Sequence, residues 1–352
     1  MIRLGHMNDT NIKILAQFNA NTQLSSSDVH SSLTNISLVT VKRRLSELTE
    51  SGLLLQSGAG RSVKYSLTKQ GLLLKPVDVD NYLAKDLDKR GSSAIFNFEL
   101  FRKPYVSLFS QRELELLDRA TETFRANAQH SDATLRSKEL LRFIIEFSWK
   151  TSQIEGNTYD LLSTERLLRY GEKSKNNTEF EAQMIINQKE ALELILDNIE
   201  LWHEPKIALL EQLHLIVGKN LSITPGIRKG LVGITGTNYR PLDNEFQIKE
   251  ALTDLFKWIQ SAGNHYEKSL LCILGVSYIQ PFIDGNKRTS RLLGNSILLN
   301  AGLAPLSYRT VDDRVYKEAT LVFYEQNSVE PFKQLFIEQY IFAAENYNIY
   351  RP

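Results

Sequence analysis

The stretch that decides the fold runs from Tyr278 to Leu293 and reads YIQPFIDGNKRTSRLL. An apolar run, Leu270 to Ile279, leads into it, and a second apolar run follows it. Proline disfavours helical geometry at the residue before it, so the first helix should end near Gln280. The pattern therefore predicts a helix, a tight loop and a second helix, with Arg288 and Arg291 in the first turns of the second.

The loop between these helices has the composition of an anion site. Gly285 and Asn286 permit a left-handed backbone, which turns successive N–H groups into one concavity. The N-terminus of the following helix adds partial positive charge. Three cations are close by: Lys287, Arg288 and Arg291. We expect the loop to bind a polyphosphate, with Asp284 holding its metal ion.

The overall composition is that of an ordinary globular protein. The chain has 352 residues, 42% hydrophobic and 24% charged, enough for two or three domains. No secretory h-region and no apolar run of membrane-spanning length is evident, so no membrane partner is expected. The single cysteine, Cys272, excludes an internal disulfide. These features favour a reducing, cytoplasmic setting.

Residues 1–75 differ from the rest of the chain in charge. They carry a net charge of +5, and the remainder carries −4. Segments 11–20, 29–33 and 37–52 have helical signals, the second with possible caps at 25–28, and in the third Leu38, Val41, Leu45 and Leu48 form an apolar stripe. Segment 53–67 reads as a hairpin with a glycine-rich tip. Three helices and a basic hairpin resemble a winged helix-turn-helix over roughly residues 8–70.

The winged-helix resemblance implies a role in DNA binding. In such domains the third helix enters the major groove and the hairpin contacts the backbone. The residues so placed here are Thr40, Lys42, Arg43 and Arg44 on the helix, and Arg61 and Lys64 on the wing. The alternative is a protein-docking module whose cations are merely solvated.

Beyond this module the chain is predicted to be all-helical. Residues 76–110 read as a linker and a first associated segment, and 111–352 as a helical domain, including a helix over about 137–156. The exception is 230–241, GLVGITGTNYRP, whose glycines and β-branched residues predict a small β-hairpin. The expected fold is mainly α, with an all-helical core, one hairpin and an N-terminal winged-helix domain.

Three segments together resemble the Fic family, filamentation induced by cAMP. QPFIDGNKRTSR, residues 280–291, matches the family signature H-P-F-x-D/E-G-N-G/K-R-x-x-R at eleven of twelve positions. TSQIEG, residues 151–156, resembles the Fic inhibitory motif S/T-x-x-x-E-G/N, placed before the core as in one class of the family. Segment 230–241 resembles the flap that aligns a target. The resemblance covers roughly residues 95–345.

The resemblance implies transfer of AMP from Mg-ATP to a Ser, Thr or Tyr hydroxyl of a target protein. Phe282 would anchor the loop, Asp284 would bind Mg²⁺, and the inhibitory motif of Thr151, Glu155 and Gly156 would hold Arg291 away from the γ-phosphate. The nucleotide would be bound by Gly285, Asn286, Lys287, Arg288 and Arg291. The target backbone would pair with Val232, Gly233 and Ile234. Two copies of the chain forming a homodimer is one assembly that we consider.

One motif position departs from the signature. Active Fic proteins have histidine as the base where this chain has Gln280, and a carboxamide does not accept a proton near neutral pH. Loss of a general base typically costs about 10²–10⁴ in rate. Catalysis is therefore expected to be weak or absent. Two alternatives follow. The first is a non-catalytic ATP-binding regulator that acts through the winged helix. The second is a phosphotransferase, because Doc-type toxins, which phosphorylate their target, also have a lysine at the position of Lys287.

Each of these residues also has a purely structural interpretation. Asp284 can simply cap the following helix, and Glu155 can be an ordinary helix-end acid before Gly156. Arg288 and Arg291 can be surface cations on one helix face. Segment 230–241 can be a structural hairpin. The joint presence of three motifs in family order favours the functional interpretation.

Overall fold

The computed structural model describes residues 9–20, 22–33, 35–90, 94–129 and 132–349. These residues are mainly helical, and the mainly α prediction is confirmed. Within the described ranges there is a single sheet, of two strands, and it belongs to the N-terminal module.

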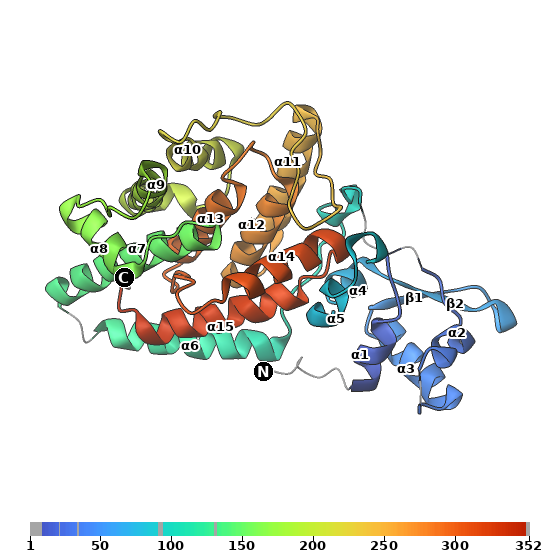
Figure 1. Cartoon of the computed structure of the whole chain (residues 1–352). Helices are drawn as coiled ribbons and strands as arrows, with labels where there is room; N and C mark the ends of the chain where they lie inside the picture. Colours follow the sequence, from blue (N-terminus) through green and yellow to red (C-terminus); the bar gives the residue numbers. More distant parts are fainter. Residues whose placement is uncertain (1–8, 21, 34, 91–93, 130–131, 350–352) are drawn as a thin grey trace.

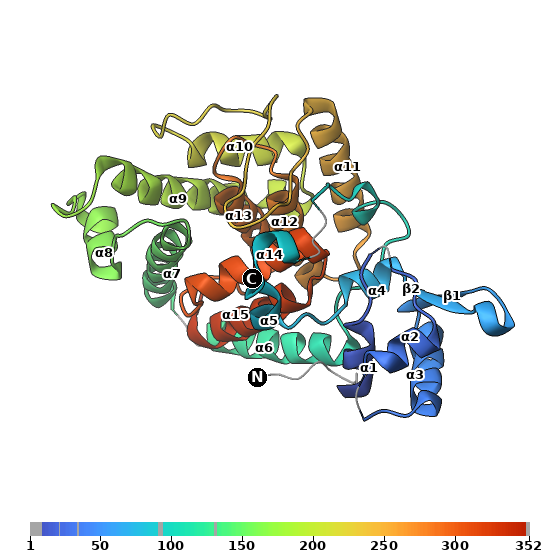
Figure 2. The ribbon, with the colours of Figure 1, turned by 45° about the vertical axis from the view of Figure 1, so that its right-hand side comes forward.

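The N-terminal module consists of three short helices and a hairpin. Its elements are α1 (Asp9–Leu15), α2 (Ser26–Ser31), α3 (Leu38–Glu50), β1 (Leu54–Ser57) and β2 (Lys64–Leu67). The strands are antiparallel, and Ser57 pairs with Lys64 at the tip. The apolar stripe of α3 is buried in a core of the module's own at Val41, Leu45 and Leu48, whereas Leu38 is half-buried. In Figures 1 and 2 this hairpin points away from the helical body.

Caps fix where the helices of this module begin. Ser25 accepts a hydrogen bond from the backbone N–H of Asp28, whose carboxylate accepts one from the backbone N–H of Ser25, which is a capping box. Ser37 accepts from the backbone N–H of Thr40 at the start of α3. Each cap satisfies helix N–H groups that have no partner within the helix.

Short elements join the module to the body. They are α4 (Lys69–Leu73), α5 (Val79–Leu83) and the 3₁₀ turns η2 (Leu87–Lys89) and η3 (Phe98–Leu100). Lys75, which is buried, donates to Asn19 of the module at 3.0 Å and to Gln326 of the body at 3.2 Å. Burial lowers the pKa of Lys75 to about 8. The module and the body are thus in direct contact through the buried side chain of Lys75.

The body is a bundle of helices around two central ones. Its helices are α6 (Gln111–Gln129), α7 (Ala133–Ile154), α8 (Leu161–Tyr170), α9 (Glu179–Asp197), η4 (Ile199–His203), α10 (Ile207–Val217), α11 (Glu245–Ser261), α12 (His265–Ile279), α13 (Asn286–Asn300), α14 (Asp313–Gln326) and α15 (Glu330–Asn346). Figure 1 shows α12 and α13 in the middle, with the others around them. None of the described helices is long and apolar enough to cross a membrane.

Close packing of α12 on α13 explains two glycines. A Cβ on Gly294 would lie 2.6 Å from the Ile273 side chain, and one on Gly275 would lie 2.5 Å from Leu255. Such distances are shorter than any ordinary van der Waals contact. These glycines let the two central helices and α11 approach closely, which fixes where the loop between α12 and α13 emerges.

The predicted β-hairpin at 230–241 is wrong. Residues 231–239 form an extended loop with a turn at Thr235–Gly236, and a single isolated bridge joins Arg240 to Ile95. The ends of the segment are instead bonded to backbone carbonyls around the end of α12: the Arg228 N–H to Pro281, and the Tyr239 hydroxyl to Tyr278. Glycines at 230, 233 and 236 weaken the case for a ladder further, because glycine disfavours regular strands.

Candidate functional site

The loop between α12 and α13 has the two left-handed residues that its tight turn requires. Gln280 ends α12 with φ 51°, and Gly285 begins α13 with φ 80°. A side chain at Gly285 would be strained, and its Cβ would lie 3.2 Å from Val217. Phe282 is fully buried and stacks on the His214 ring at 3.7 Å. The loop is thereby anchored in the core at its centre.

Asn286 holds the loop in shape from within. Its carboxamide oxygen accepts the Phe282 N–H at 2.8 Å, and its Nδ2 donates to the Phe282 carbonyl and to Gln280 Oε1, each at 2.8 Å. The Gln280 Nε2 in turn donates to the Ser277 carbonyl at 2.6 Å. Both ends of the Gln280 carboxamide are therefore engaged within the protein.

The loop forms the floor of a pocket of about 420 Å³. The pocket brings together four parts of the chain: the end of α7, segment 232–235, the loop 280–288 and one face of α14. Its lining residues are Glu155, Val232, Gly233, Ile234, Thr235, Gln280, Ile283, Asp284, Gly285, Asn286, Lys287, Arg288, Lys317, Thr320, Leu321 and Tyr324. One cavity is therefore shared by three parts of the chain that are far apart in sequence: loop 280–288, Glu155 and segment 232–235.

The cations of the loop are held by specific partners. Arg288, almost fully buried, lies 3.2 Å from Asp284, and its Nη1 is buried without a partner among the described residues. Arg291, fully buried, donates to the Thr151 hydroxyl at 2.6 Å and to the Thr151 carbonyl at 2.8 Å. The Arg291 guanidinium also lies over the Tyr316 ring. The Arg291 guanidinium is thus held in one direction by Thr151, whereas Arg288 keeps a buried N–H group that, within the described ranges, is free for a ligand.

Glu155 lies against two of these cations. Its Oε1 accepts from Arg291 at 2.9 Å, and its Oε2 is 3.6 Å from Lys287. Burial alone would raise the pKa of Glu155, but the charges of Arg291 and Lys287 and the hydrogen bond from Arg291 outweigh it and lower the pKa. Glu155 is therefore an anion at neutral pH. Gly156 follows with φ 96°, which turns the chain sharply after α7.

Asp284 is the carboxylate of the pocket that can hold a metal ion. Its side chain is 62% exposed; Oδ1 accepts the Gly285 N–H, and Oδ2 faces Arg288. The described residues contain no cluster of three or more metal-ligating side chains. Mg²⁺ needs no such cage, because it is commonly bound by one or two carboxylates together with substrate phosphates and water. The donor set fits Mg²⁺ carried in with a polyphosphate.

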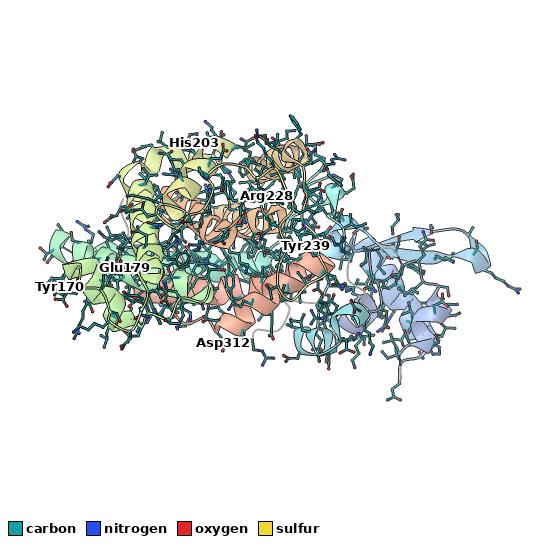
Figure 3. All side chains as sticks on the ribbon, turned by 45° about the horizontal axis from the view of Figure 1, so that its top comes forward. Tyr170, Glu179, His203, Arg228, Tyr239 and Asp312 are labelled. Carbon is teal, nitrogen blue, oxygen red and sulfur yellow. The ribbon has the colours of Figure 1, made fainter. Side chains whose placement is uncertain are left out.

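The structure also brings in residues that the sequence did not single out. His214, on α10, meets the Asp284 carbonyl through Nε2 at 3.0 Å, and burial lowers its pKa to about 4. Arg228 donates through Nε to the Gln280 carbonyl at 2.6 Å. Figure 3 labels Arg228 and Tyr239, which come before and at the end of segment 231–239. These contacts join residues 39 to 70 positions apart in the sequence, so they become visible only in the folded structure.

The α14 wall of the pocket was missed in the same way. Lys317, Thr320, Leu321 and Tyr324 recur at helical spacing, which by itself indicates only one face of a helix. The Tyr324 hydroxyl lies 3.5 Å from Gln280 Nε2. No sequence signal distinguishes this face from an ordinary packed one.

The six cations and polar residues predicted to contact DNA lie on the module, and none of them lines the pocket. Lys42, Arg43, Arg61 and Lys64 are exposed, and Thr40 is half-buried. Arg44 differs, because it is half-buried and bonds to Glu47 at 2.6 Å. Arg43 also lies 3.9 Å from Glu47. The positive charge of α3 that has no acidic partner is therefore smaller than the sequence suggests.

Comparison with known proteins finds similarity to one family. The Fic/DOC family model matches residues 206–298, which include α12, the loop and most of α13. The chain is 25% identical over 248 residues to protein adenylyltransferase fic-1 of Caenorhabditis briggsae, covering 69% of this chain and 48% of that protein. It is 28% identical over 209 residues to protein adenylyltransferase Fic of Drosophila ananassae, covering 57% and 41%. The chain thus spans less than half the length of these relatives.

Solved structures agree on the fold. Fic-1 from C. elegans superposes with a TM-score of 0.55 at 20% identity, covering 67% of this chain and 71% of that one. A Fic-domain-containing signalling protein from Bacteroides thetaiotaomicron gives 0.55 at 19% identity, covering 67% and 99%. At this identity the likeness concerns the fold alone. The match to the Fic/DOC family model thus falls on the part of the chain that carries α12, the loop and most of α13.

Proposed function

We propose that the chain binds Mg-ATP in the pocket on the α12–α13 loop and is an adenylyltransferase-like protein, held off by Glu155. The observation that carries the proposal is the single pocket shared by loop 280–288, Glu155 and segment 232–235. The names of the curated relatives, protein adenylyltransferases, favour AMP transfer over other uses of this loop. The protein substrate would be one with an accessible Ser, Thr or Tyr hydroxyl.

The phosphates would lie on the first turn of α13. The backbone N–H groups at Gly285, Asn286 and Lys287 and the buried guanidinium of Arg288 supply positive charge there. Mg²⁺ on Asp284 would neutralise phosphate charge when bound. Arg291 would take the γ-phosphate after Glu155 has moved aside. Segment 232–235 would align the target beside the α-phosphate.

The transfer step lacks a strong proton acceptor. The target hydroxyl would attack the α-phosphorus, the bond to the β-phosphate oxygen would break, and pyrophosphate would leave. The hydroxyl proton needs a base, and the Gln280 carboxamide is not one. Gln280 is moreover occupied by Ser277 and Asn286. The proton would pass to water, so we expect slow transfer and firm binding.

Transfer is tested with ATP labelled on the α-phosphate, with and without protein targets, in wild type and in the Glu155→Gly/Gln280→His variant. We expect incorporation of the α-label in the double variant, including self-labelling, and little in wild type. A double variant that binds ATP normally but incorporates no α-label would contradict the proposal. Incorporation of γ-label instead would assign the chain to Doc-like phosphotransfer.

A second candidate function rests on the fully engaged Gln280 and on the module. We propose as the alternative that the pocket binds ATP without transfer and that the N-terminal module, residues 1–75, binds DNA through α3 and the hairpin. Exposed Lys42, Arg43, Arg61 and Lys64 support it. It predicts duplex-DNA affinity that falls as salt rises and that changes when ATP is added. Identical affinity with and without ATP would contradict it.

A further inference from the structure

Segment 231–239 forms one wall of the pocket without being part of a sheet. Its base is fixed by Arg228 and Tyr239, as described above. Its turn is fixed by a residue from outside the family-like core: Arg90, in the linker after the N-terminal module, donates through Nη1 to the Gly236 carbonyl at 3.0 Å. Gly236 also lies on α14, since its Cβ would be 3.6 Å from Leu321.

The guanidinium of Arg90 is itself fixed from several sides. Its Nη1 is 3.4 Å from Oε1 of Glu325, whose side chain is fully buried. Its Nη2 donates to the Leu83 carbonyl at 3.2 Å, and its Nε donates to the Lys85 carbonyl at 3.1 Å. A planar guanidinium with all three nitrogens engaged has one orientation. Arg90 therefore offers the Gly236 carbonyl a donor in a defined place.

From Glu325 a chain of hydrogen bonds runs back to the N-terminal module. The Tyr82 hydroxyl donates to Glu325 Oε2 at 2.7 Å, and Gln326 Nε2 donates to the Tyr82 hydroxyl at 2.9 Å. Lys75 Nζ donates to Gln326 Oε1 and to Asn19 Oδ1. Burial and the Glu325 carboxylate raise the pKa of Tyr82, so its proton stays in the bond. The bonds from Lys75 to Gln326, from Gln326 to Tyr82 and from Tyr82 to Glu325 all point toward Glu325, an arrangement in which neighbouring bonds polarise one another, whereas Lys75 also donates in the opposite direction, to Asn19.

The chain of bonds lies next to the pocket as well. Glu325 and Gln326 end α14, the helix that lines the pocket with Thr320, Leu321 and Tyr324. The same linker contacts segment 231–239 a second time, because Asn238 Nδ2 donates to Asp88 Oδ1 at 3.2 Å. The linker, the end of α14 and the turn of the flap segment form one hydrogen-bonded unit.

We propose that Arg90 is the positioning residue of segment 231–239: it holds the turn at Gly236, and so one wall of the pocket, while the module sets the place of Arg90 through Asn19, Lys75, Gln326, Tyr82 and Glu325. This inference does not rest on AMP transfer, because it concerns the placement of the wall whatever the pocket binds. It makes the N-terminal module a determinant of pocket geometry.

The test measures the mobility of the segment directly. A nitroxide is attached at Gly233→Cys, where nothing lies within 4 Å of the position of the Cβ. Cys272 is fully buried and burial raises its thiol pKa, so labelling is confined to position 233. Electron paramagnetic resonance then gives the ratio of mobile to ordered label in the full chain. In Arg90→Gln we expect this ratio to rise about tenfold, the effect of losing one hydrogen bond from a charged donor.

Matched variants separate positioning from general loss of stability. Arg169→Gln removes an exposed arginine of α8 that pairs with Glu165 at 2.7 Å and, among the described residues, contacts neither the linker nor segment 231–239, and it should leave the spectrum unchanged. Tyr82→Phe removes one hydroxyl from the chain and Lys75→Met removes its far end; both should raise the mobile fraction, by less than Arg90→Gln. An unchanged spectrum in Arg90→Gln, or an equal change in Arg169→Gln, would overturn the assignment of Arg90. Should Arg90→Gln fail to fold, unchanged spectra in both Tyr82→Phe and Lys75→Met would overturn the part given to the module.

Discussion

Removal of the negative charge of Glu155 should tighten ATP binding. In the free protein the Glu155 carboxylate occupies Arg291, at 2.9 Å, and lies 3.6 Å from Lys287. A polyphosphate that uses Arg291 must displace it. Glu155→Gln keeps the size of the side chain but removes the charge, so that the variant isolates the electrostatic competition.

The size of the effect follows from the burial of the pair. Arg291 is fully buried and the Glu155 side chain is 20% exposed, so the bond is charge-assisted and poorly screened. Such bonds contribute about 1.5–3 kcal/mol, which corresponds to roughly a 10- to 100-fold change in an equilibrium constant. We expect the Kd of Mg-ATP, measured by titration calorimetry, to fall by this factor. The ligand-free variant should melt at a lower temperature, because Arg291 loses its anionic partner.

The control is Glu165→Gln on α8, an acid that pairs with Arg169 at 2.7 Å and does not line the pocket. It should leave the Kd of Mg-ATP as in wild type. Equal affinities of wild type and Glu155→Gln for Mg-ATP would refute the reasoning, because they would mean that Arg291 is not what the nucleotide needs. A similar gain in Glu165→Gln would refute it as well.

Three other predictions follow from the same geometry. Gln280→His in the Glu155→Gly background should raise the rate of α-label transfer about 10²- to 10⁴-fold over Glu155→Gly alone, by restoring a base; equal rates would contradict this. Burial lowers the pKa of His214 from 6.5 to about 4, so as the pH falls the unfolded chain takes up this proton before the folded chain does. The free energy of unfolding should therefore fall by about 3 kcal/mol between pH 6.5 and pH 4. Denaturant titration of His214→Gln should show no such loss. Gly294→Ala should destabilise by about 1–3 kcal/mol, because its Cβ would overlap Ile273, and unchanged melting would contradict the packing described.

The loop could be predicted from the sequence because its signals are local. Pro281 ends a helix, Gly285 permits the turn, and the cations follow within six residues. The helical periodicity of the body was equally local and was predicted correctly. The hairpin at 230–241 was not, because β propensity cannot show whether a partner strand lies at hand. Here the segment is held by single hydrogen bonds, in which the side chains of Arg90, Arg228 and Tyr239 each donate to a backbone carbonyl.

The same distinction holds for the residues of the site. The sequence by itself determined which side chains can meet phosphate, which acid can oppose them, and that position 280 has no base, since residue chemistry does not depend on fold. Only the tertiary structure decided that α14 makes the facing wall and that Arg90 reaches Gly236. Contacts between residues far apart in the chain are set by the packing of α7, α13 and α14 in three dimensions, and no local pattern of residues encodes that packing.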